Sequence, residues 1–194
     1  MPRSYSGLFA PLLVALGCSS PSTPPEGPLQ YHQQFAGNVS TLYGTSGHDR
    51  SSLTDGYAPD FHWLRADSTL DSLSGHIGQK VMINFWATWC APCKAEMPEI
   101  ERLVQDMGDT VFVIGMSVDY PGDPVPLVQQ YVRDHGLTYQ FVVDSAWTIY
   151  NKYELWTTTA IPETMIIDSK GILRYDVTGS QTEEAFRSYL NKVR

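Results

Sequence analysis

Cysteine and positive charge are both scarce in this sequence. Its 194 residues include only three cysteines, which are too few for a fold stapled by several disulfides. Thirteen lysines and arginines stand against 21 aspartates and glutamates, so the net charge of −8 offers no basic surface for nucleic acid. No internal repeat is visible either. These absences exclude a disulfide scaffold and a repeat architecture, and they argue against a nucleic-acid partner.

Apolar residues, in contrast, are plentiful enough for a packed core. Hydrophobic residues make up 42% of the chain and charged residues 18%, which argues against global disorder. A chain of 194 residues has room for one globular domain and a tail, but not for two full domains.

The first residues have the pattern of a secretory signal. One positive charge at Arg3 precedes an apolar run over 8–17, about half of the roughly 20 residues that span a bilayer. The run ends in Val-Ala-Leu-Gly-Cys18, which resembles the bacterial lipobox, where the signal is cleaved before a lipid-carrying cysteine. We therefore expect a signal peptide at 1–17, a lipidated Cys18 and an extracytoplasmic or periplasmic lipoprotein anchored in the membrane. An ordinary cleaved signal and an uncleaved short anchor are the alternatives; Ser19 favours the outer membrane if Gram-negative sorting applies.

A tether follows the cysteine. Residues 19–28 read SSPSTPPEGP, a composition that cannot bury a core and favours extended conformers. Up to Gly56 the chain remains polar, and its hydrophobic residues show no clear helical or strand periodicity. We therefore expect residues 18–56 to be the lipid-anchored cysteine and a flexible linker, and residues 57–194 to be the folded domain.

The folded domain alternates strand-like and helix-like segments. A nearly continuous apolar run of strand length, KVMINFWA at 80–87, is typical of a buried central strand. The alternation predicts an α/β fold in which a central sheet carries helices on both faces, and a late antiparallel hairpin makes the sheet mixed. We expect a short strand or hairpin within 58–73, strands at 80–87, 110–118, 139–143, 163–168 and 172–177, and helices at 92–107, 124–135, 146–154 and 181–193.

Cys90 and Cys93 form a Cys-x-x-Cys motif between a buried strand and a helix. A zinc site would need further ligands, which the sequence does not offer. A structural disulfide that closes so short a loop would restrict the unfolded chain very little and so add little stability. At this junction the spacing indicates a redox pair.

Cys90 stands at the helix N-terminus, which favours a thiolate and makes Cys90 the attacking sulfur. Cys93, about one turn further, would resolve the mixed disulfide. Pro92 is tolerated in the first turn and stiffens the loop.

The segment from Asn84 to Lys94, NFWATWCAPCK, resembles thioredoxin, and its continuation AEMP at 95–98 resembles the TlpA/ResA branch. The resemblance runs from about Ala58 to the C-terminus and implies a thioredoxin-like fold with a central αβ insert at about 124–143. It also implies a membrane-tethered thiol reductase without a cofactor or a metal. Its expected partners are disulfide-containing protein substrates, with apocytochrome c as a candidate, and a membrane thiol–disulfide carrier as electron donor.

The same resemblance implies roles for residues around the cysteines. Asn84 stands where an acid would be needed, and its amide cannot exchange a proton, so Glu96 would supply that acid. Desolvation near the sulfurs would raise the pKa of Glu96 and let it shuttle the proton of the resolving thiol. The alternative is a solvated helix glutamate. Ile161-Pro162 matches the family's cis-proline, which faces the disulfide. The substrate-facing surface is expected to include Trp89, Pro92, Ile161 and Pro162.

Other functions remain open at this point. A protein of the same fold can also run as a disulfide oxidase or isomerase, because direction depends on reduction potential. A thiol peroxidase of the related fold would need a threonine and a single peroxidatic cysteine in another loop pattern, which is absent. A copper-binding thioredoxin-like protein would usually space its cysteines by three residues. The sequence therefore favours a thiol–disulfide oxidoreductase that reduces protein disulfides.

Overall fold

The computed structural model describes residues 38–44, 56–65, 67–120, 122, 124–153 and 160–193, and the structural statements below concern these residues. The expected signal peptide at 1–17 and Cys18 lie outside them, as does most of the expected linker. In this described part, no helix combines the length and the apolar character needed to cross a membrane.

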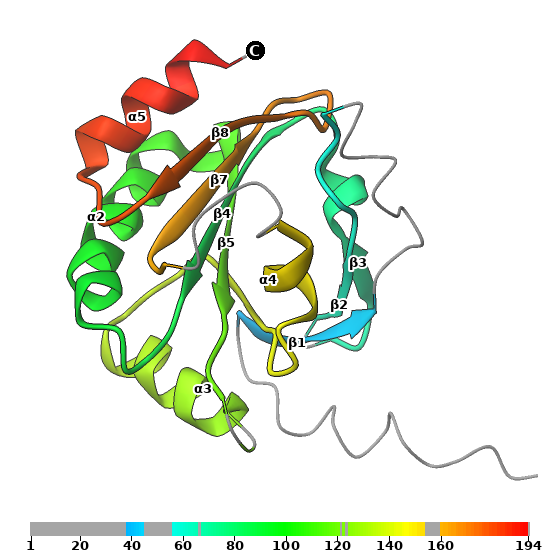
Figure 1. The fold of residues 1–194 in the computed structure, drawn as a ribbon, viewed down its shortest axis with the longest axis vertical. Coiled ribbons are helices and arrows are strands. Elements are labelled where there is room, and N and C mark those ends of the chain that lie inside the picture. Colours follow the sequence, from blue (N-terminus) through cyan, green and yellow to red (C-terminus); the bar gives the residue numbers. More distant parts are fainter. Residues whose placement is uncertain are drawn as a thin grey trace, which may run out of the picture.

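An eight-stranded sheet forms the centre of the domain (Figure 1). Its strands are β1 (Val39–Gly44), β2 (His62–Leu64), β3 (Leu70–Ser72), β4 (Lys80–Trp86), β5 (Val111–Ser117), β6 (Gln140–Val143), β7 (Glu163–Ile167) and β8 (Leu173–Thr178). They follow the order β3-β2-β1-β6-β5-β4-β7-β8 across the sheet. β4 pairs in parallel with β5 and antiparallel with β7, which confirms the predicted mixed sheet.

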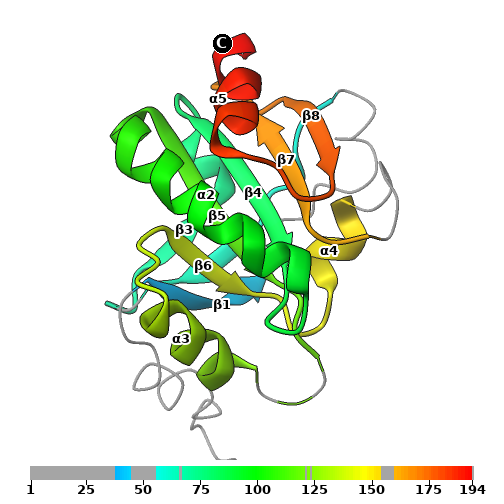
Figure 2. The same cartoon turned by 90° about the vertical axis from the view of Figure 1, so that its left-hand side faces the viewer.

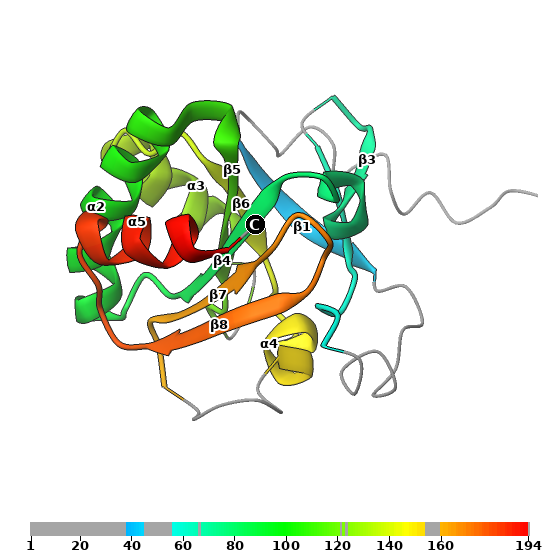
Figure 3. The same ribbon diagram turned by 90° about the horizontal axis from the view of Figure 1, so that it is seen from above.

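Helices cover both faces of this sheet, as predicted. The helices are α2 (Ala91–Met107), α3 (Val125–Asp134), α4 (Thr148–Tyr153) and α5 (Glu183–Lys192), with short 3₁₀ turns at Leu73–His76 and Gly108–Thr110. α2, α3 and α5 lie on one face, and α4 lies on the other (Figure 3). In Figure 2, α2 and α3 stand in front of the strands that they cover. The fold is thioredoxin-like, with α3 and β6 as the expected central insert.

Burial explains why these segments take these places. All but the first residue of β4 are buried, as expected for a strand covered on both faces, whereas β8 at the edge alternates half-buried and exposed residues. The close fit between strands is visible at Gly115 of β5. A Cβ atom there would lie 2.6 Å from the ring of Phe141 on β6, so only glycine fits without a shift.

The structure differs from the sequence-based expectation at β1, which lies inside the predicted flexible linker. β1 fills the place between β2 and β6, antiparallel to the first and parallel to the second. The backbone N–H of Phe141 donates to the Asn38 carbonyl at 2.7 Å, and Val39 and Ser40 are buried. The strand is held by its pairing with both β2 and β6, and it covers the backbone groups of β6, which would otherwise form an open edge. A segment of six residues with hydrophobic side chains only at Val39, Leu42 and Tyr43 has no regular hydrophobic period from which to predict it.

Candidate redox site

Cys90 and Cys93 lie where β4 ends and α2 begins, and they are joined in a disulfide with their Cα atoms 5.3 Å apart. Cys90 is the N-cap residue of α2, and the backbone N–H of Cys93 donates to Cys90 Sγ at 3.2 Å. Cys90 is 5% exposed and Cys93 1% exposed. Cys90 is therefore both the more exposed of the two cysteines and the one whose sulfur accepts an N–H of the helix start, an arrangement that stabilises a thiolate on Cys90 in the reduced protein.

The turn before β7 faces this disulfide. The Ile161–Pro162 peptide bond is cis, as the sequence predicted. The carbonyl oxygen of Ile161 lies 3.7 Å from Cys90 Sγ, so the expected substrate-facing backbone stands directly beside the attacking sulfur. The N–H of Gly179, just after β8, donates to the Pro162 carbonyl at 2.8 Å and ties this turn to the neighbouring edge strand.

Glu96 is buried one turn along α2 from Cys93, on the same helix face, and only 1% of it is exposed. Asn84 Nδ2 on β4 donates to Glu96 Oε1 at 2.7 Å, and the backbone N–H of Gln181 donates to Oε2 at 2.7 Å. Burial outweighs these hydrogen bonds and raises the pKa of Glu96 to about 7. The alternative of a solvated helix glutamate does not fit this burial. Glu96 is instead able to take up and release a proton near neutral pH.

The two tryptophans of the motif have different environments. Trp86 is fully buried and packs against Tyr131 and Phe141, with ring centroids 5.3 Å and 5.7 Å away. Trp89, next to Cys90, is 63% exposed. Pro92 is exposed as well, so both expected substrate-facing residues of the motif are accessible.

Two further contributors escaped the sequence analysis. The buried carboxylate of Asp119 accepts hydrogen bonds from the N–H of Thr88 at 3.0 Å and from its hydroxyl at 2.6 Å, and so holds the loop that carries Cys90. The position of Asp119, directly after the buried strand predicted at 110–118, could have marked it in the sequence as a residue near the site. The second contributor is the Gln181 backbone, whose contact with Glu96 spans 85 positions and leaves no mark in the sequence.

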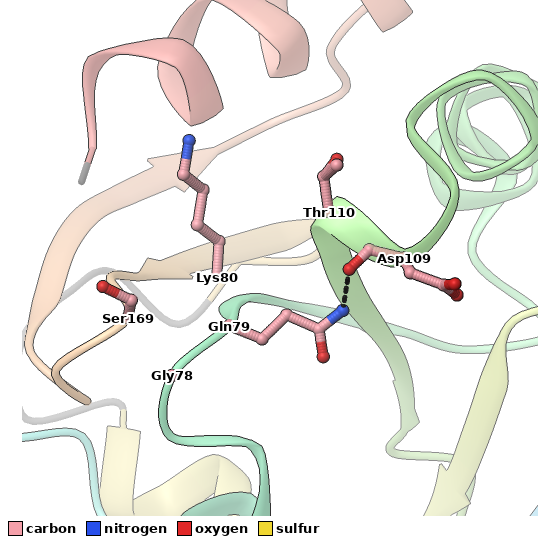
Figure 4. A pocket seen from close by; sticks show the side chains of 6 residues that line it. All are labelled: Gly78, Gln79, Lys80, Asp109, Thr110 and Ser169. Atoms are coloured by element: carbon pink, nitrogen blue, oxygen red, sulfur yellow. Dashed lines mark hydrogen bonds between the residues drawn. The ribbon is translucent and has the colours of Figure 1, made fainter.

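Other concave or ligating features do not coincide with the cysteines. Within the described ranges, no group of three or more His, Cys, Asp or Glu side chains is placed to hold a metal ion. An open pocket lies at the opposite end of β4, where Gln79 Nε2 donates to the Asp109 carbonyl (Figure 4). Its lining consists of Gly78, Gln79, Lys80, Asp109, Thr110 and Ser169.

A family model, the AhpC/TSA family, matches residues 55–176. The chain belongs to this family. It is also 32% identical over 141 residues to the thiol-disulfide oxidoreductase ResA of Oceanobacillus iheyensis, covering 70% of each chain. The ResA of Geobacillus thermodenitrificans is 28% identical over 158 residues, which cover 79% of this chain and 86% of that one. These relatives place the chain in the TlpA/ResA-like group of the family.

A solved structure shares both the fold and a detectable sequence similarity. The exposed lipoprotein thioredoxin Etrx1 of Streptococcus pneumoniae superposes with a TM-score of 0.56 at 26% identity, covering 69% of this chain and 99% of that chain. Together with the Cys90–Cys93 disulfide at the start of α2, these similarities make the AhpC/TSA-family chain a thiol–disulfide oxidoreductase of the thioredoxin fold.

The geometry predicts which thiol reacts first. After reduction of the disulfide, iodoacetamide should modify Cys90 before Cys93, with an apparent pKa below the roughly 8.5 of a free cysteine. The reason is the N–H of Cys93 aimed at Cys90 Sγ, together with the greater accessibility of Cys90. Peptide mapping after alkylation at a series of pH values measures both rates, and faster modification of Cys93 would reverse the assignment.

Proposed function

We propose that this protein reduces disulfides of exported proteins outside the cytoplasm, while anchored to a membrane through a lipid on Cys18. The observation that carries the reducing direction is the buried Glu96 one turn from Cys93, with its pKa raised to about 7. A carboxylate one helical turn from Cys93, on the same buried face, disfavours the thiolate and so lowers the reduction potential.

The proposed reaction uses both thiols in turn. The Cys90 thiolate attacks one sulfur of the substrate disulfide, forms a mixed disulfide and releases the other substrate sulfur as a thiolate, which takes up a proton from water. The Glu96 carboxylate accepts the proton of Cys93, whose thiolate then attacks Cys90 Sγ and releases the second substrate sulfur as a thiolate. This thiolate takes up the proton that Glu96 holds, so Glu96 returns to its carboxylate form. Two electrons pass from the dithiol to the substrate, and the Cys90–Cys93 disulfide remains. A membrane thiol–disulfide carrier would return these two electrons.

Two local effects on the potential oppose each other. The helix N-terminus stabilises the Cys90 thiolate and raises the potential, whereas Glu96 lowers it. An imbalance of about 1.4 kcal/mol shifts a two-electron potential by only about 30 mV. We expect a value nearer the roughly −270 mV of thioredoxin than the roughly −120 mV of a strong disulfide donor.

Equilibration of the protein with glutathione buffers tests this direction. The fraction of Cys90–Cys93 disulfide at each ratio of reduced to oxidised glutathione gives the midpoint. A midpoint more oxidising than about −180 mV, the value of a disulfide isomerase, would favour a disulfide oxidase or isomerase instead.

The anchoring proposal rests on the lipobox-like end of the leader, and the structural similarity to a protein described as an exposed lipoprotein supports it. In cells, a Cys18→Ala variant is expected to move from the membrane fraction to the soluble fraction or to remain as an uncleaved precursor. Labelling with a palmitate analogue should be lost in parallel. Unchanged labelling of the variant would show that Cys18 is not the lipidated residue.

The proposed substrates are proteins with accessible disulfides, and apocytochrome c is one candidate from the TlpA/ResA resemblance. Nothing in the charge of the chain favours nucleic acid, since the net charge is −8. The proteins that a Cys93→Ala variant retains as mixed disulfides in cells would identify the substrates directly.

A further inference from the structure

Two exposed aromatic residues outside the Cys-x-x-Cys motif, Tyr120 and Trp147, lie at the same end of the central strands as Cys90. Tyr120 is 65% exposed and Trp147 is 40% exposed, beside the 63% of Trp89. Keeping three large aromatic rings in water is unfavourable, and apolar side chains clustered on a surface mark interaction sites more often than scattered ones do.

The backbone brings Trp89 and Tyr120 together. Trp86 and Ser117 are partners in the parallel pairing of β4 and β5, so the segments that follow them leave the sheet side by side. The hydrogen bonds between Thr88 and the Asp119 carboxylate join these two segments. Trp89 and Tyr120 are the next residue along each segment. Their backbone positions therefore lie on neighbouring segments, beside Cys90.

Trp147 extends this surface from a third segment. Its indole Nε1–H donates to the Val118 carbonyl at 2.8 Å, so the polar group of the ring is already satisfied. The ring centroid lies 6.1 Å from that of Tyr120, edge to face, and 6.1 Å from that of the buried Tyr150. The accessible part of Trp147 is therefore the apolar part of a ring that is held in place.

We propose that the aromatic surface formed by Trp89, Tyr120 and Trp147 binds an aromatic side chain of the substrate polypeptide, within about four residues of its reactive cysteine. The proposal rests on the proposed function and names the substrate class of the same site.

The redox chemistry determines the occupant of this surface. A disulfide holds the two Cα atoms about 4.4–6.8 Å apart, so any polypeptide that exchanges with Cys90 must lie over the residues around Cys90. An extended chain advances about 3.3–3.6 Å per residue, which brings neighbours of the substrate cysteine over Trp89 and Tyr120. The Ile161 carbonyl borders the other side of the sulfur, at 3.7 Å. Among the described residues at these two borders, the large exposed rings are those of the aromatic surface.

The test follows mixed-disulfide formation, which does not depend on the direction of net electron flow. The full-length protein carries Cys18→Ser and Cys93→Ala, so that Cys90 is the one reactive thiol. Its thiolate attacks the cysteine sulfur of a peptide activated as a thionitrobenzoate disulfide, and coloured thionitrobenzoate leaves with the bonding electron pair. Peptides of equal charge carry tryptophan or alanine at each position within four residues of the cysteine. We expect tryptophan to raise the second-order rate constant about fivefold to tenfold at one or more positions.

Variants of Tyr120 connect this preference to the surface. Tyr120→Ala should bring the tryptophan-to-alanine ratio close to one, and Tyr120→Phe should restore it. Tyr57→Ala is the matched control, because Tyr57 is an exposed tyrosine beside the turn of the β7–β8 hairpin, where it pairs with Ile172. This control should keep the ratio of the parent protein.

Several outcomes would overturn the aromatic surface as a substrate site. These are the lack of any tryptophan preference, a ratio that survives Tyr120→Ala, and a sedimentation experiment in which Tyr120→Ala dissociates a dimer while the ratio persists. The last result would assign the surface to a second copy of the chain. A complete lack of reaction would overturn the thiol–disulfide exchange itself, and this proposal with it. A preserved tryptophan preference with an oxidising midpoint would support the surface and reject only the reducing direction.

Discussion

Replacement of Cys93 by alanine is expected to stop turnover while leaving the first chemical step intact. The Cys90 thiolate still attacks the substrate, but no second thiol lies one turn away to release it. Mixed disulfides should therefore accumulate, and steady-state reduction of a protein disulfide should fall by at least about 10³-fold, as for other residues that act as one catalytic unit. Non-reducing electrophoresis followed by mass spectrometry measures both effects.

Cys90→Ser is the matched control for this experiment. It removes the attacking sulfur and keeps Cys93, which is 1% exposed. We expect an equal loss of turnover without trapped adducts, since a serine hydroxyl is a much weaker nucleophile towards disulfides than a thiolate. Adducts on Cys93 in the Cys90→Ser protein, formed as fast as those on Cys90 in the Cys93→Ala protein, would contradict the assigned order of attack.

Replacement of Glu96 by glutamine is expected to slow disulfide reduction about 10-fold to 100-fold near neutral pH, at the low end of what a positioned acid or base contributes. Because the pKa of Glu96 is about 7, its carboxylate becomes available to accept the Cys93 proton as the pH rises through that value. The rate for the unmodified protein should therefore rise through about pH 7. In the variant, this rise should be replaced by one at the higher pKa of the thiols.

The same group should make folding stability depend on pH. A folded-state pKa above the unfolded value means that the native protein binds more protons, so the stabilisation is complete below about pH 4.5 and is lost as the pH rises through about 7. At about 1.36 kcal/mol per pH unit, the loss is on the order of 3 kcal/mol. Urea unfolding at several pH values should show this slope in the unmodified protein and not in Glu96→Gln.

Comparing slopes is preferable to comparing absolute stabilities here. A glutamine amide would place an N–H₂ group opposite the Asn84 or Gln181 donor, which costs stability at every pH. Glu184→Gln makes the same change of charge at an exposed position on α5 and should leave both pH profiles unchanged. A Glu96→Gln protein with the original rate and slope would show that Glu96 is only a packed residue.

The features that could be predicted from the sequence are those encoded by residues close together along the chain. The apolar run at 80–87 predicted β4, and the position of Cys90 between that strand and a helix predicted the N-cap arrangement of α2. The TlpA/ResA resemblance predicted the cis bond before Pro162, which the structure shows. These features lie within short stretches or in a recognisable motif.

The features that escaped prediction depend on contacts between distant segments. β1 is held by pairing with β2 and with β6, which is about one hundred residues away along the chain, and its six residues include only three hydrophobic ones. The resemblance predicted that burial raises the pKa of Glu96, but it did not predict the hydrogen bond from the Gln181 backbone, 85 positions away. The ring contact between Tyr120 and Trp147, and the place of Tyr120 on the segment beside that of Trp89, likewise depend on three segments that are separate in the sequence.

The role of Glu96 is tested most directly by titrating its carboxyl in the protein with the Cys90–Cys93 disulfide intact, which is the state of the structure. Carbon-13 NMR of protein labelled at the glutamate side-chain carboxyl, with Glu96→Gln to assign the signal, reports its protonation at each pH. We expect a midpoint near 7, a value at which the carboxylate can exchange a proton with Cys93 once the disulfide is reduced. A midpoint near 4.5, the value of an ordinary glutamate, would contradict the role of Glu96 in the reaction.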